Sequence, residues 1–344
     1  MKKEISGKWY SISRKISLYW VVIIVSAAVI PFNIYINHFN IPVAHNDEMA
    51  ESCNLPYALI RTNEPKLARM LLYANVSTED ERLMPLKDNI NAYINQKKVD
   101  NTLKTASVYF NILDSANGWF VINQNEKFYI ASLLKVAFMV AILKDVENNP
   151  ALLETKIHFN QHTGAILKQD IIKNHLTFGE YYTLKELLKY AICYSDNDAG
   201  YLLCDACKES TYKKLFTDLQ MPPDDINLDY LCSVEEYSRL FRVLYNASYL
   251  SNDMSEYALE LLSNSDFNDG MVKHLDKNLT VARKFGERGT TGDKELHEFG
   301  IVYFKNQPYL LGIMIRGNDT QSLENVISDI SLLVYDEMKK GSMQ

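Results

Sequence analysis

Hydrophobic and polar positions divide the chain into one continuous apolar run near its N-terminus and a longer, patterned remainder. Residues 17–30 carry no charged side chain, and residues 31–36 extend the run to about 20 residues, the length that crosses a hydrocarbon core about 30 Å thick. We therefore predict a transmembrane anchor at residues 16–36, preceded by a cytoplasmic tip at residues 1–15.

The charges around this run predict its orientation. Residues 1–15 hold five basic residues and one acidic residue, a net charge of +4, and Asp47, Glu48 and Glu51 follow the run. Positive charge stays on the cytoplasmic side, so we expect a single-pass protein of the cell membrane with an extracytoplasmic body. A cleaved signal peptide, which would give a secreted protein, is the alternative, although the small residues 26–28 lie inside the run rather than after it.

The pattern after the anchor changes twice. Residues 37–85 are weakly patterned, and we predict a stalk with short helical pieces. Residues 86–340 form the predicted folded domain, which opens with a helix at Leu86–Asn95. Two strand-like segments follow, Ser107–Leu113 and Trp119–Asn123, joined by a tight turn at Asn117-Gly118.

The rest of the domain continues with a buried helix at Ser132–Asn148, apolar on most faces. Helices dominate residues 150–265, where Thr183 with Glu186 and Ser233 with Glu236 form two predicted capping boxes. The end of the domain returns to strands, with a glycine-rich connection and a last helix. We expect strands at Leu279–Lys284, Gly300–Phe304 and Tyr309–Ile315, the connection at residues 286–293, and a helix that Asp319 or Thr320 caps and that ends near Lys340.

This order predicts an α+β fold class. Strands lie at both ends of the domain, so they must meet in one sheet, with the middle helices as an inserted lobe.

Composition and charge exclude several functional classes. The 344 residues are 47% hydrophobic and 23% charged, with a net charge of −7. An acidic body argues against nucleic-acid binding, and no phosphate-binding glycine motif is present. The five cysteines include a lone CxxC pair, Cys204 and Cys207, interpreted as small residues on a helix face, and the histidines lack metal-ligand spacing. We expect no metal and no cofactor, and no sequence feature specifies an oligomeric state.

Three short motifs carry candidate chemistry. Ser132 and Lys135 form an SxxK pair at the start of the buried helix, where residues three apart share a face. A desolvated lysine loses its proton more easily and can serve as a base. Ser195-Asp196-Asn197 lies between two helices, and Lys284-Phe285-Gly286 ends a strand.

In this order the motifs resemble the SxxK, SDN and KTG signature of class A β-lactamases and penicillin-binding proteins. The resemblance covers residues 86–340 and includes the hairpin before Ser132 and the segment His297–Val302. It implies a five-stranded antiparallel sheet with flanking helices and an all-helical lobe, with the site between them.

The resemblance also implies residue roles. Ser132 is the acylated nucleophile, Lys135 its base or proton relay, and Ser195 passes a proton to the leaving nitrogen. Among the substrate-binding residues, Asn197 holds the substrate amide, Lys284 anchors the substrate carboxylate, and the backbone N–H groups of Ser132 and Glu287 form the oxyanion hole. Gly286, at the strand end, lets the substrate backbone approach closely.

Each motif also has a purely structural interpretation. Ser132 is then a helix N-cap, Lys135 extends to solvent, Ser195-Asp196-Asn197 ends one helix and caps another, and Lys284 is an edge-strand charge.

Two departures from the family pattern bear on the substrate. Phe285 replaces a Thr or Ser hydroxyl that helps to bind the substrate carboxylate, and its larger ring changes the substrate-binding region. The segment Leu219–Ser233 contains no glutamate to activate a deacylating water; it offers only Asp224, Asp225 and Asp229.

These observations predict a membrane-anchored serine acyl-hydrolase that acts on a β-lactam or a D-alanyl cell-wall peptide. The absent glutamate favours a peptidase-like role. The alternatives are a non-catalytic module on the same fold that binds or senses cell-wall peptide, and an unrelated membrane-tethered helical protein.

Overall fold

The described part of the chain begins after the predicted anchor. The computed structural model describes residues 57–62, 69–76, 78–115, 118–161, 174–221, 230–290, 292–305 and 307–341. The predicted tip and anchor, residues 1–15 and 16–36, lie outside these residues. Among the helices in the described ranges, none is both long and apolar enough to cross a bilayer.

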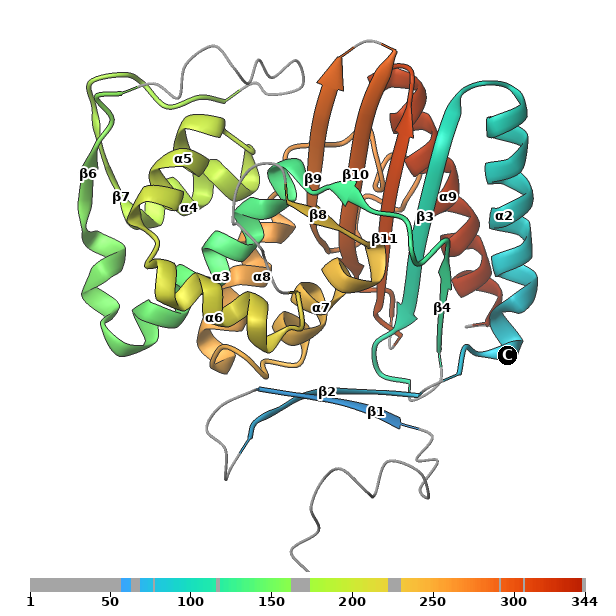
Figure 1. Cartoon of the computed structure of the whole chain (residues 1–344), viewed down its shortest axis with the longest axis horizontal. Coiled ribbons are helices and arrows are strands. Elements are labelled where there is room, and N and C mark those ends of the chain that lie inside the picture. Colours follow the sequence, from blue (N-terminus) through green and yellow to red (C-terminus); the bar gives the residue numbers. More distant parts are fainter. Residues whose placement is uncertain are drawn as a thin grey trace, which may run out of the picture. The chain divides into compact units, whose positions relative to one another are not determined.

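A five-stranded antiparallel sheet forms the centre of the domain, in the order β4-β3-β11-β10-β9 (Figure 1). Its strands are β3 (Leu103–Ile112), β4 (Trp119–Ile122), β9 (Val281–Thr290), β10 (Asp293–Val302) and β11 (Tyr309–Gly317). The join between the two ends of the domain is the β3–β11 pair, in which Val108 lies opposite Ile313. The predicted α+β fold with an inserted helical lobe is confirmed.

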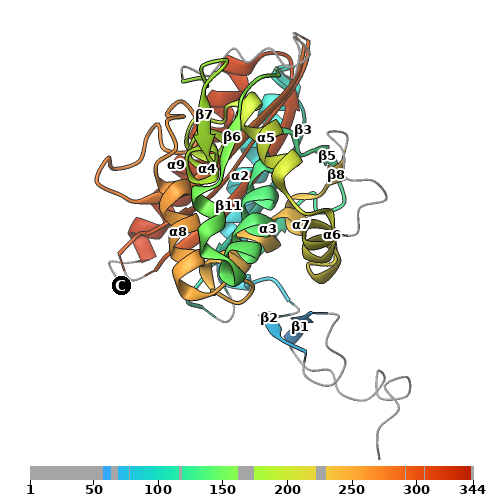
Figure 2. The same cartoon turned by 90° about the vertical axis from the view of Figure 1, so that its left-hand side faces the viewer.

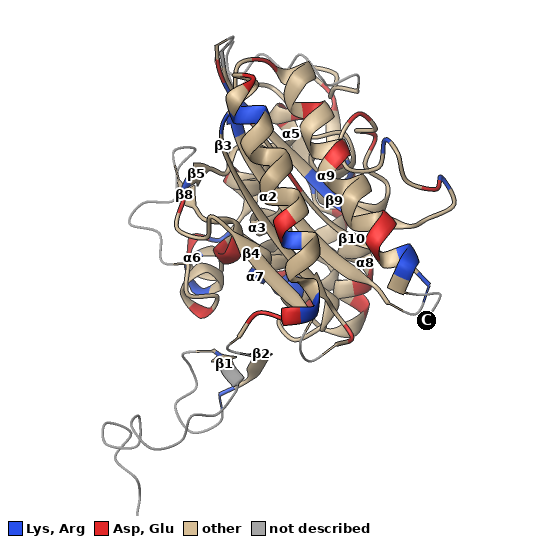
Figure 3. Cartoon of the chain, turned by 90° about the vertical axis from the view of Figure 1, so that its right-hand side faces the viewer, with Lys and Arg blue, Asp and Glu red and all other residues tan. Residues whose placement is uncertain are grey.

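Helices lie on both sides of this sheet. Two of them, α2 (Met84–Val99) and α9 (Thr320–Gly341), cover one face, and acidic and basic residues are interspersed along both (Figure 3). The other face packs against the helical lobe, in which α3 lies between α8 and α6 (Figure 2). The lobe consists of α3 (Leu134–Asn148), α4 (Leu184–Cys193), α5 (Asn197–Ala206), α6 (Glu209–Asp218), α7 (Val234–Tyr245) and α8 (Asn252–Ser263).

Strand alternation creates two cores, because successive side chains point to opposite faces of a sheet. In β11, Leu310 and Met314 join the core under the helical lobe. Leu311, Ile313 and Ile315 join the core under α2 and α9. The sheet is therefore buried on both faces and forms a rigid support for residues at its edge.

The capping signals were correctly predicted. The hydroxyl of Thr183 accepts from the backbone N–H of Glu186, and that of Ser233 accepts from Glu236, with the reciprocal glutamate bonds also present. The Asp319 carboxylate accepts from the backbone N–H of Ser322 in the first turn of α9.

Three predicted segments differ from the structure, and one of them is the strand expected at Gly300–Phe304, which is β10 and begins at Asp293. Residues 286–290 belong to β9 and not to a connection, because Gly289, at φ +96°, and Gly292, at φ +89°, accommodate a tight hairpin into β10. Within the predicted stalk, β1 (Tyr57–Arg61) and β2 (Leu71–Val76) form an antiparallel ribbon in place of helical pieces. Cross-strand pairing and the burial of Leu72 and Tyr73 outweigh the weak local pattern.

Shorter elements connect the longer ones, with η2 directly before α2 and the others in or beside the lobe. They are the strand pairs β5 (Phe128–Tyr129) with β8 (Leu231–Cys232) and β6 (Lys156–His158) with β7 (Tyr181–Thr183), and the 3₁₀ turns η2 (Glu81–Leu83), η3 (Ala131–Leu133) and η4 (Pro150–Glu154).

Candidate active site

The candidate nucleophile lies on a strained turn. Ser132 is the central residue of η3 and is partly exposed, and Ala131 before it has φ +49°. A non-glycine residue in this region costs about 1–3 kcal/mol and persists only where surrounding contacts impose it. Here the hydroxyl of Tyr237 donates to the carbonyl of Leu133 at 2.8 Å.

The edge strand β9 presses closely against the same turn. A Cβ atom at Gly286 would lie 3.0 Å from the carbonyl oxygen of Ile130 and 3.1 Å from the backbone nitrogen of Leu133. Glycine at this position therefore permits the close approach of strand and nucleophile turn.

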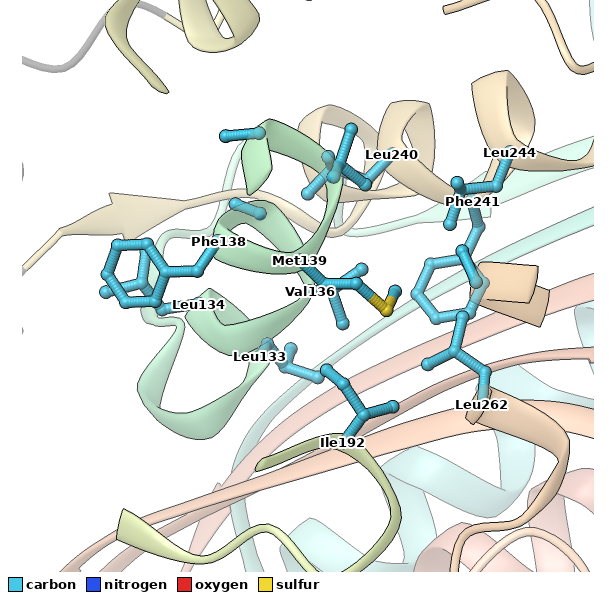
Figure 4. Packing of buried hydrophobic residues seen from close by; sticks show 14 of the residues in the cluster. Leu133, Leu134, Val136, Phe138, Met139, Ile192, Leu240, Phe241, Leu244 and Leu262 are labelled. Atoms are coloured by element: carbon cyan, nitrogen blue, oxygen red, sulfur yellow. The ribbon is translucent and has the colours of Figure 1, made fainter. Parts of the chain in front are cut away.

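Lys135 lies inside the protein beside the candidate nucleophile. Its Nζ donates to Ser132 Oγ at 3.0 Å, to the carbonyl of Ser195 at 2.6 Å and to Asn197 Oδ1 at 2.8 Å. Side chains of α3 and its neighbours fill the space around this helix (Figure 4). The lysine is 6% exposed, so the interpretation that it extends to solvent is wrong.

The Ser195-Asp196-Asn197 segment is also held tightly. Ser195 is buried at φ +59°, and Asp196 caps α5 by accepting from the backbone N–H of Ala199 at 2.7 Å. His175 Nδ1 lies 3.0 Å from the other carboxylate oxygen of Asp196. The capping interpretation is correct for Asp196, and it leaves Ser195 and Asn197 directed at Lys135.

Lys284 approaches from the sheet. Its Nζ donates to Ser195 Oγ at 2.7 Å and to the carbonyl of Phe285 at 2.8 Å, and the residue is 0% exposed. It lies on the edge strand, as predicted, but it is buried there. Ser195 thus lies between two lysines, since Lys135 Nζ is 3.4 Å from the same hydroxyl.

Burial sets the charge of this cluster. It lowers the pKa of Lys135 from 10.5 to about 7, opposed by the negative charge of Asp196. Burial also lowers the pKa of Lys284 well below its usual value, and the nearby Lys135 acts in the same direction. The neutral form of Lys135 is accordingly available near neutral pH.

Two predicted substrate-binding residues have other contacts. Phe285 is 3% exposed and packs on Phe267 in the core under α2 and α9, with ring centroids 4.4 Å apart. The expectation that its ring alters the surface offered to substrate is corrected, because the ring is buried. The Glu287 carboxylate accepts from Lys294 and Thr320, each at 2.9 Å, and the role of its backbone N–H stays a prediction.

The sequence analysis missed some supporting residues. A Cβ at Gly200 would lie 2.6 Å from Lys135 Cε, so glycine at this position lets the lysine side chain lie where it does. Tyr237 is buried on α7 and meets Leu133 only in the folded structure. No local pattern marks either residue.

Other candidate features lie apart from this cluster. Asp224, Asp225 and Asp229 are outside the described residues. Cys204 is exposed on α5, whereas Cys207 follows the end of this helix and packs, partly buried, against the core under the helical lobe, so the interpretation of both as residues of one helix face is wrong for Cys207. The described residues contain no group of three or more His, Cys, Asp or Glu side chains suited to a metal ion.

A serine and a buried lysine on one helical turn, beside a sheet edge and a helical lobe, are typical of serine hydrolases with the β-lactamase and transpeptidase fold. The sequence model of the Beta-lactamase enzyme family matches residues 85–338. The chain belongs to this family, and membership supports a serine hydrolase activity. None of the curated proteins matches the chain.

Solved structures agree with this assignment. A mutant of PBP-A, solved as an acyl-enzyme complex with penicillin G, is 21% identical, with a TM-score of 0.63 over 75% of this chain and 97% of that chain. A representative of class A β-lactamase from Bacteroides cellulosilyticus is 20% identical, with a TM-score of 0.62 over 74% and 99%. At these identities, the likeness establishes the fold.

Proposed function

We propose that this protein is an extracytoplasmic serine acyl-hydrolase that forms an acyl-enzyme on Ser132. Its substrate is a β-lactam or a D-alanyl cell-wall peptide, and residues 16–36 anchor it in the membrane. The observation that carries the proposal is the 3.0 Å contact between Ser132 Oγ and the buried Nζ of Lys135. The predicted apolar span and the basic residues before it support the location.

The contacts support a complete route for the proton. Neutral Lys135 takes the proton of Ser132 as the serine oxygen attacks the substrate carbonyl. When the tetrahedral intermediate collapses, Ser195 gives its proton to the leaving nitrogen and recovers one from Lys135, 3.4 Å away. Lys284 holds the Ser195 hydroxyl at 2.7 Å throughout.

The substrate would lie beside the partly exposed Ser132 and Asn197. In this proposal the backbone N–H groups of Ser132 and Glu287 stabilise the developing oxyanion, as donors fixed before the reaction begins. Asn197 binds the substrate amide. Its Oδ1 now accepts a hydrogen bond from Lys135 Nζ at 2.8 Å, and in the complex this oxygen must either give up that bond or accept from Lys135 and the substrate together.

The segment before α7 favours a peptidase-like enzyme over a fast β-lactamase. Residues 219–233 contain no glutamate. Without a placed base to activate water, an acyl-enzyme persists or transfers its acyl group to another acceptor.

A binding or sensor module that recognises cell-wall peptide is the second candidate function. The observation that favours it is Phe285, which cannot donate the hydrogen bond of the hydroxyl that the family places there. The intact set of Ser132, Lys135 and Ser195 favours catalysis, because a binding module has no need of an acid–base relay.

The test is to incubate the full chain and its Ser132→Ala variant with benzylpenicillin, following antibiotic loss and protein mass together. A lasting adduct that requires Ser132 is the expected result. Rapid antibiotic loss without an adduct, again dependent on Ser132, would indicate a β-lactamase. Antibiotic turnover that survives Ser132→Ala would contradict the proposal.

A further inference from the structure

Tyr129 lies three residues before Ser132, and two side chains of β10 hold its backbone. Its N–H donates to Glu295 Oε2 at 3.2 Å, and its carbonyl oxygen lies 3.0 Å from His297 Nε2. Glu295 and His297 are two residues apart in β10 and therefore point to the same face of the sheet. These two contacts join the segment that leads into the turn of Ser132 directly to the central sheet.

The contact between His297 and Tyr129 is a hydrogen bond that the imidazole donates. Its Nε2 faces two acceptors, the Tyr129 carbonyl and, at 3.7 Å, Glu295 Oε2, so this nitrogen carries the hydrogen. The ring is 0% exposed, and its Nδ1 has no hydrogen-bond partner among the residues that the structure describes. Within that part of the chain, the imidazole therefore makes its polar contacts on the side of Tyr129.

Glu295 is held in turn by β11. Arg316, which lies opposite it in the register, donates to Glu295 Oε1 from Nη2 at 2.6 Å and from Nε at 2.8 Å, and leaves Oε2 for Tyr129. Burial acts to raise the pKa of Glu295, but the neighbouring His297 and Arg316 lower it below its usual value. The acceptor for the Tyr129 N–H is therefore an ionised carboxylate, which makes a stronger hydrogen bond than a neutral group does.

Ring contacts hold the same segment. The Phe128 ring meets the imidazole of His297 edge to face, with centroids 5.4 Å apart and an angle of 72°. The guanidinium of Arg316 lies 5.3 Å from the centroid of the Phe128 ring, and that of Arg288, on β9, lies 4.1 Å from the centroid of the Tyr129 ring. Side chains from three neighbouring strands thus fasten β5 to the sheet.

The turn of Ser132 depends on support from both sides. Ala131, at φ +49°, is in a conformation that persists only where surrounding contacts impose it. After the turn, Tyr237 donates to the carbonyl of Leu133. Before the turn, the contacts from β10 fix the chain at Tyr129. The position of the Ser132 hydroxyl, and of the Ser132 N–H in the proposed oxyanion hole, follows from this geometry.

We propose that His297 is a positioning residue for acylation, which holds the Tyr129 carbonyl and thereby keeps the turn of Ser132 in the geometry for attack on the substrate. The inference rests on the proposed acylation of Ser132. His297 acts through the backbone of Tyr129 and exchanges no proton with the substrate. Loss of its hydrogen bond should therefore slow the bond-forming step and leave the preceding binding of substrate unchanged.

Two variants of nearly equal side-chain length separate the hydrogen bond from the space that the ring fills. His297→Gln keeps an N–H donor at the end of the side chain, and His297→Met has none. The full chain and both variants are mixed with a series of benzylpenicillin concentrations, and adduct formation is followed by intact-protein mass. The series gives the limiting acylation rate and the concentration that produces half of this rate.

We expect His297→Met to lower the limiting rate about 10- to 100-fold, the loss typical of a misplacement of about 1 Å at a reacting group. The concentration for half of the limiting rate should stay unchanged, and His297→Gln should retain most of the rate. His158→Met is the matched control, because His158 Nε2 also lies near a backbone carbonyl, that of Gly179 at 3.2 Å, but on β6. This control should acylate like the unaltered protein.

Each outcome has a distinct meaning. An unchanged limiting rate in a His297→Met variant that unfolds cooperatively in urea would overturn the positioning role and leave the proposed function in place. A His297→Gln variant as slow as His297→Met would overturn the role of the hydrogen bond to Tyr129. If His297→Met does not fold, His297→Asn, whose amide is one methylene too short to reach Tyr129, replaces it in both comparisons. Neither a Ser132-dependent adduct nor loss of antibiotic with the unaltered protein would contradict the proposed function, and the inference with it.

Discussion

Lys135 Nζ lies 3.0 Å from the Oγ of Ser132, the residue three positions earlier in the chain. The lysine is buried, whereas the serine is partly exposed. One helical turn therefore joins a partly exposed serine, the proposed nucleophile, to a desolvated lysine, its proposed base. The pairing has consequences for pH dependence, for the glycine beside the lysine and for the identity of the acylated residue.

The acylation rate should depend on the protonation of Lys135. Because burial lowers its pKa from 10.5 to about 7, and only the neutral amine accepts a proton, the rate should rise as pH increases through about 7 and then level off. A stopped-flow or quenched pH series with a single acyl donor measures the inflection. An inflection that stays near pH 10 would contradict Lys135 as the base.

Asp196→Asn is the matched variant for this profile. The negative charge of Asp196 raises the pKa of Lys135, so its removal should move the inflection to lower pH. Asparagine is as good an N-cap as aspartate, so α5 should keep its cap. An unchanged inflection in a folded Asp196→Asn variant would show that the Asp196 charge does not tune Lys135.

Gly200→Ala should displace Lys135. The added Cβ would lie 2.6 Å from Lys135 Cε, and a misplacement of about 1 Å at a catalytic group costs up to about 100-fold in rate. In a Lys135→Ala background the clash disappears, and alanine should instead stabilise the helix by up to about 1 kcal/mol. Acylation rates of the single variant and thermal unfolding of all combinations check this. Equal stability effects of Gly200→Ala in both backgrounds would contradict the contact.

Arg242 fastens the β1–β2 ribbon to α7. Its guanidinium lies 4.1 Å from the ring centroid of Tyr73, and Nη2 donates to the carbonyl of Ala74 at 3.1 Å. Losing these contacts should cost about 1–3 kcal/mol of local stability. Arg242→Met should therefore speed tryptic cleavage after Arg61 and Arg69 by about tenfold or more.

Arg239→Met is the control for the ribbon experiment. Arg239 lies on the same helix but donates to the carbonyls of Leu219 and Gln220. Equal acceleration of cleavage after Arg61 by both variants would mean that the loss of any arginine from α7 releases the ribbon, and that the contacts of Arg242 with Tyr73 and Ala74 are not responsible.

Glu298 should make stability fall as pH rises. The residue is 0% exposed, with Arg283 Nε 3.5 Å from its carboxylate, and burial raises its pKa from 4.5 to about 7. Between these values the folded state binds more protons than the unfolded state. The stabilisation is complete below about pH 4.5, and about 3 kcal/mol of it is lost as pH rises through 7.

Glu298→Gln removes this titration. Urea unfolding of both proteins at pH 5 and pH 8 should show that the variant gains stability relative to the unaltered protein at the higher pH. The ion pair with Arg283 forms only when Glu298 is ionised, so its loss in the variant belongs to the same pH-dependent difference. A stability difference that is the same at both pH values would contradict the raised pKa.

Local signals explain what the sequence could predict. The capping boxes at Thr183 and Ser233 are complete within four residues, and the SxxK spacing alone places Lys135 on the face of Ser132. Strands at both ends of the domain require one sheet, which brings Lys284 to the helical lobe.

Features that depend on distant partners escaped prediction. Phe285 adjoins a motif residue, so local sequence placed its ring toward substrate, but Phe267 provides a buried partner. Residues 286–290 contain two glycines and read as a loop, although pairing with β10 keeps them in a strand. The close contact of position 200 with the Lys135 side chain arises only when α5 packs against this lysine.

The most direct measurement of the central claim is peptide mapping of the trapped acyl-enzyme. The full chain is acylated with benzylpenicillin, denatured in acid and digested, and the modified peptide is sequenced by tandem mass spectrometry. The account predicts one adduct per chain on Ser132, absent in Ser132→Ala and formed at least about 100-fold more slowly in Lys135→Ala. An adduct on another residue, or acylation that proceeds at an unchanged rate without Lys135, would contradict it.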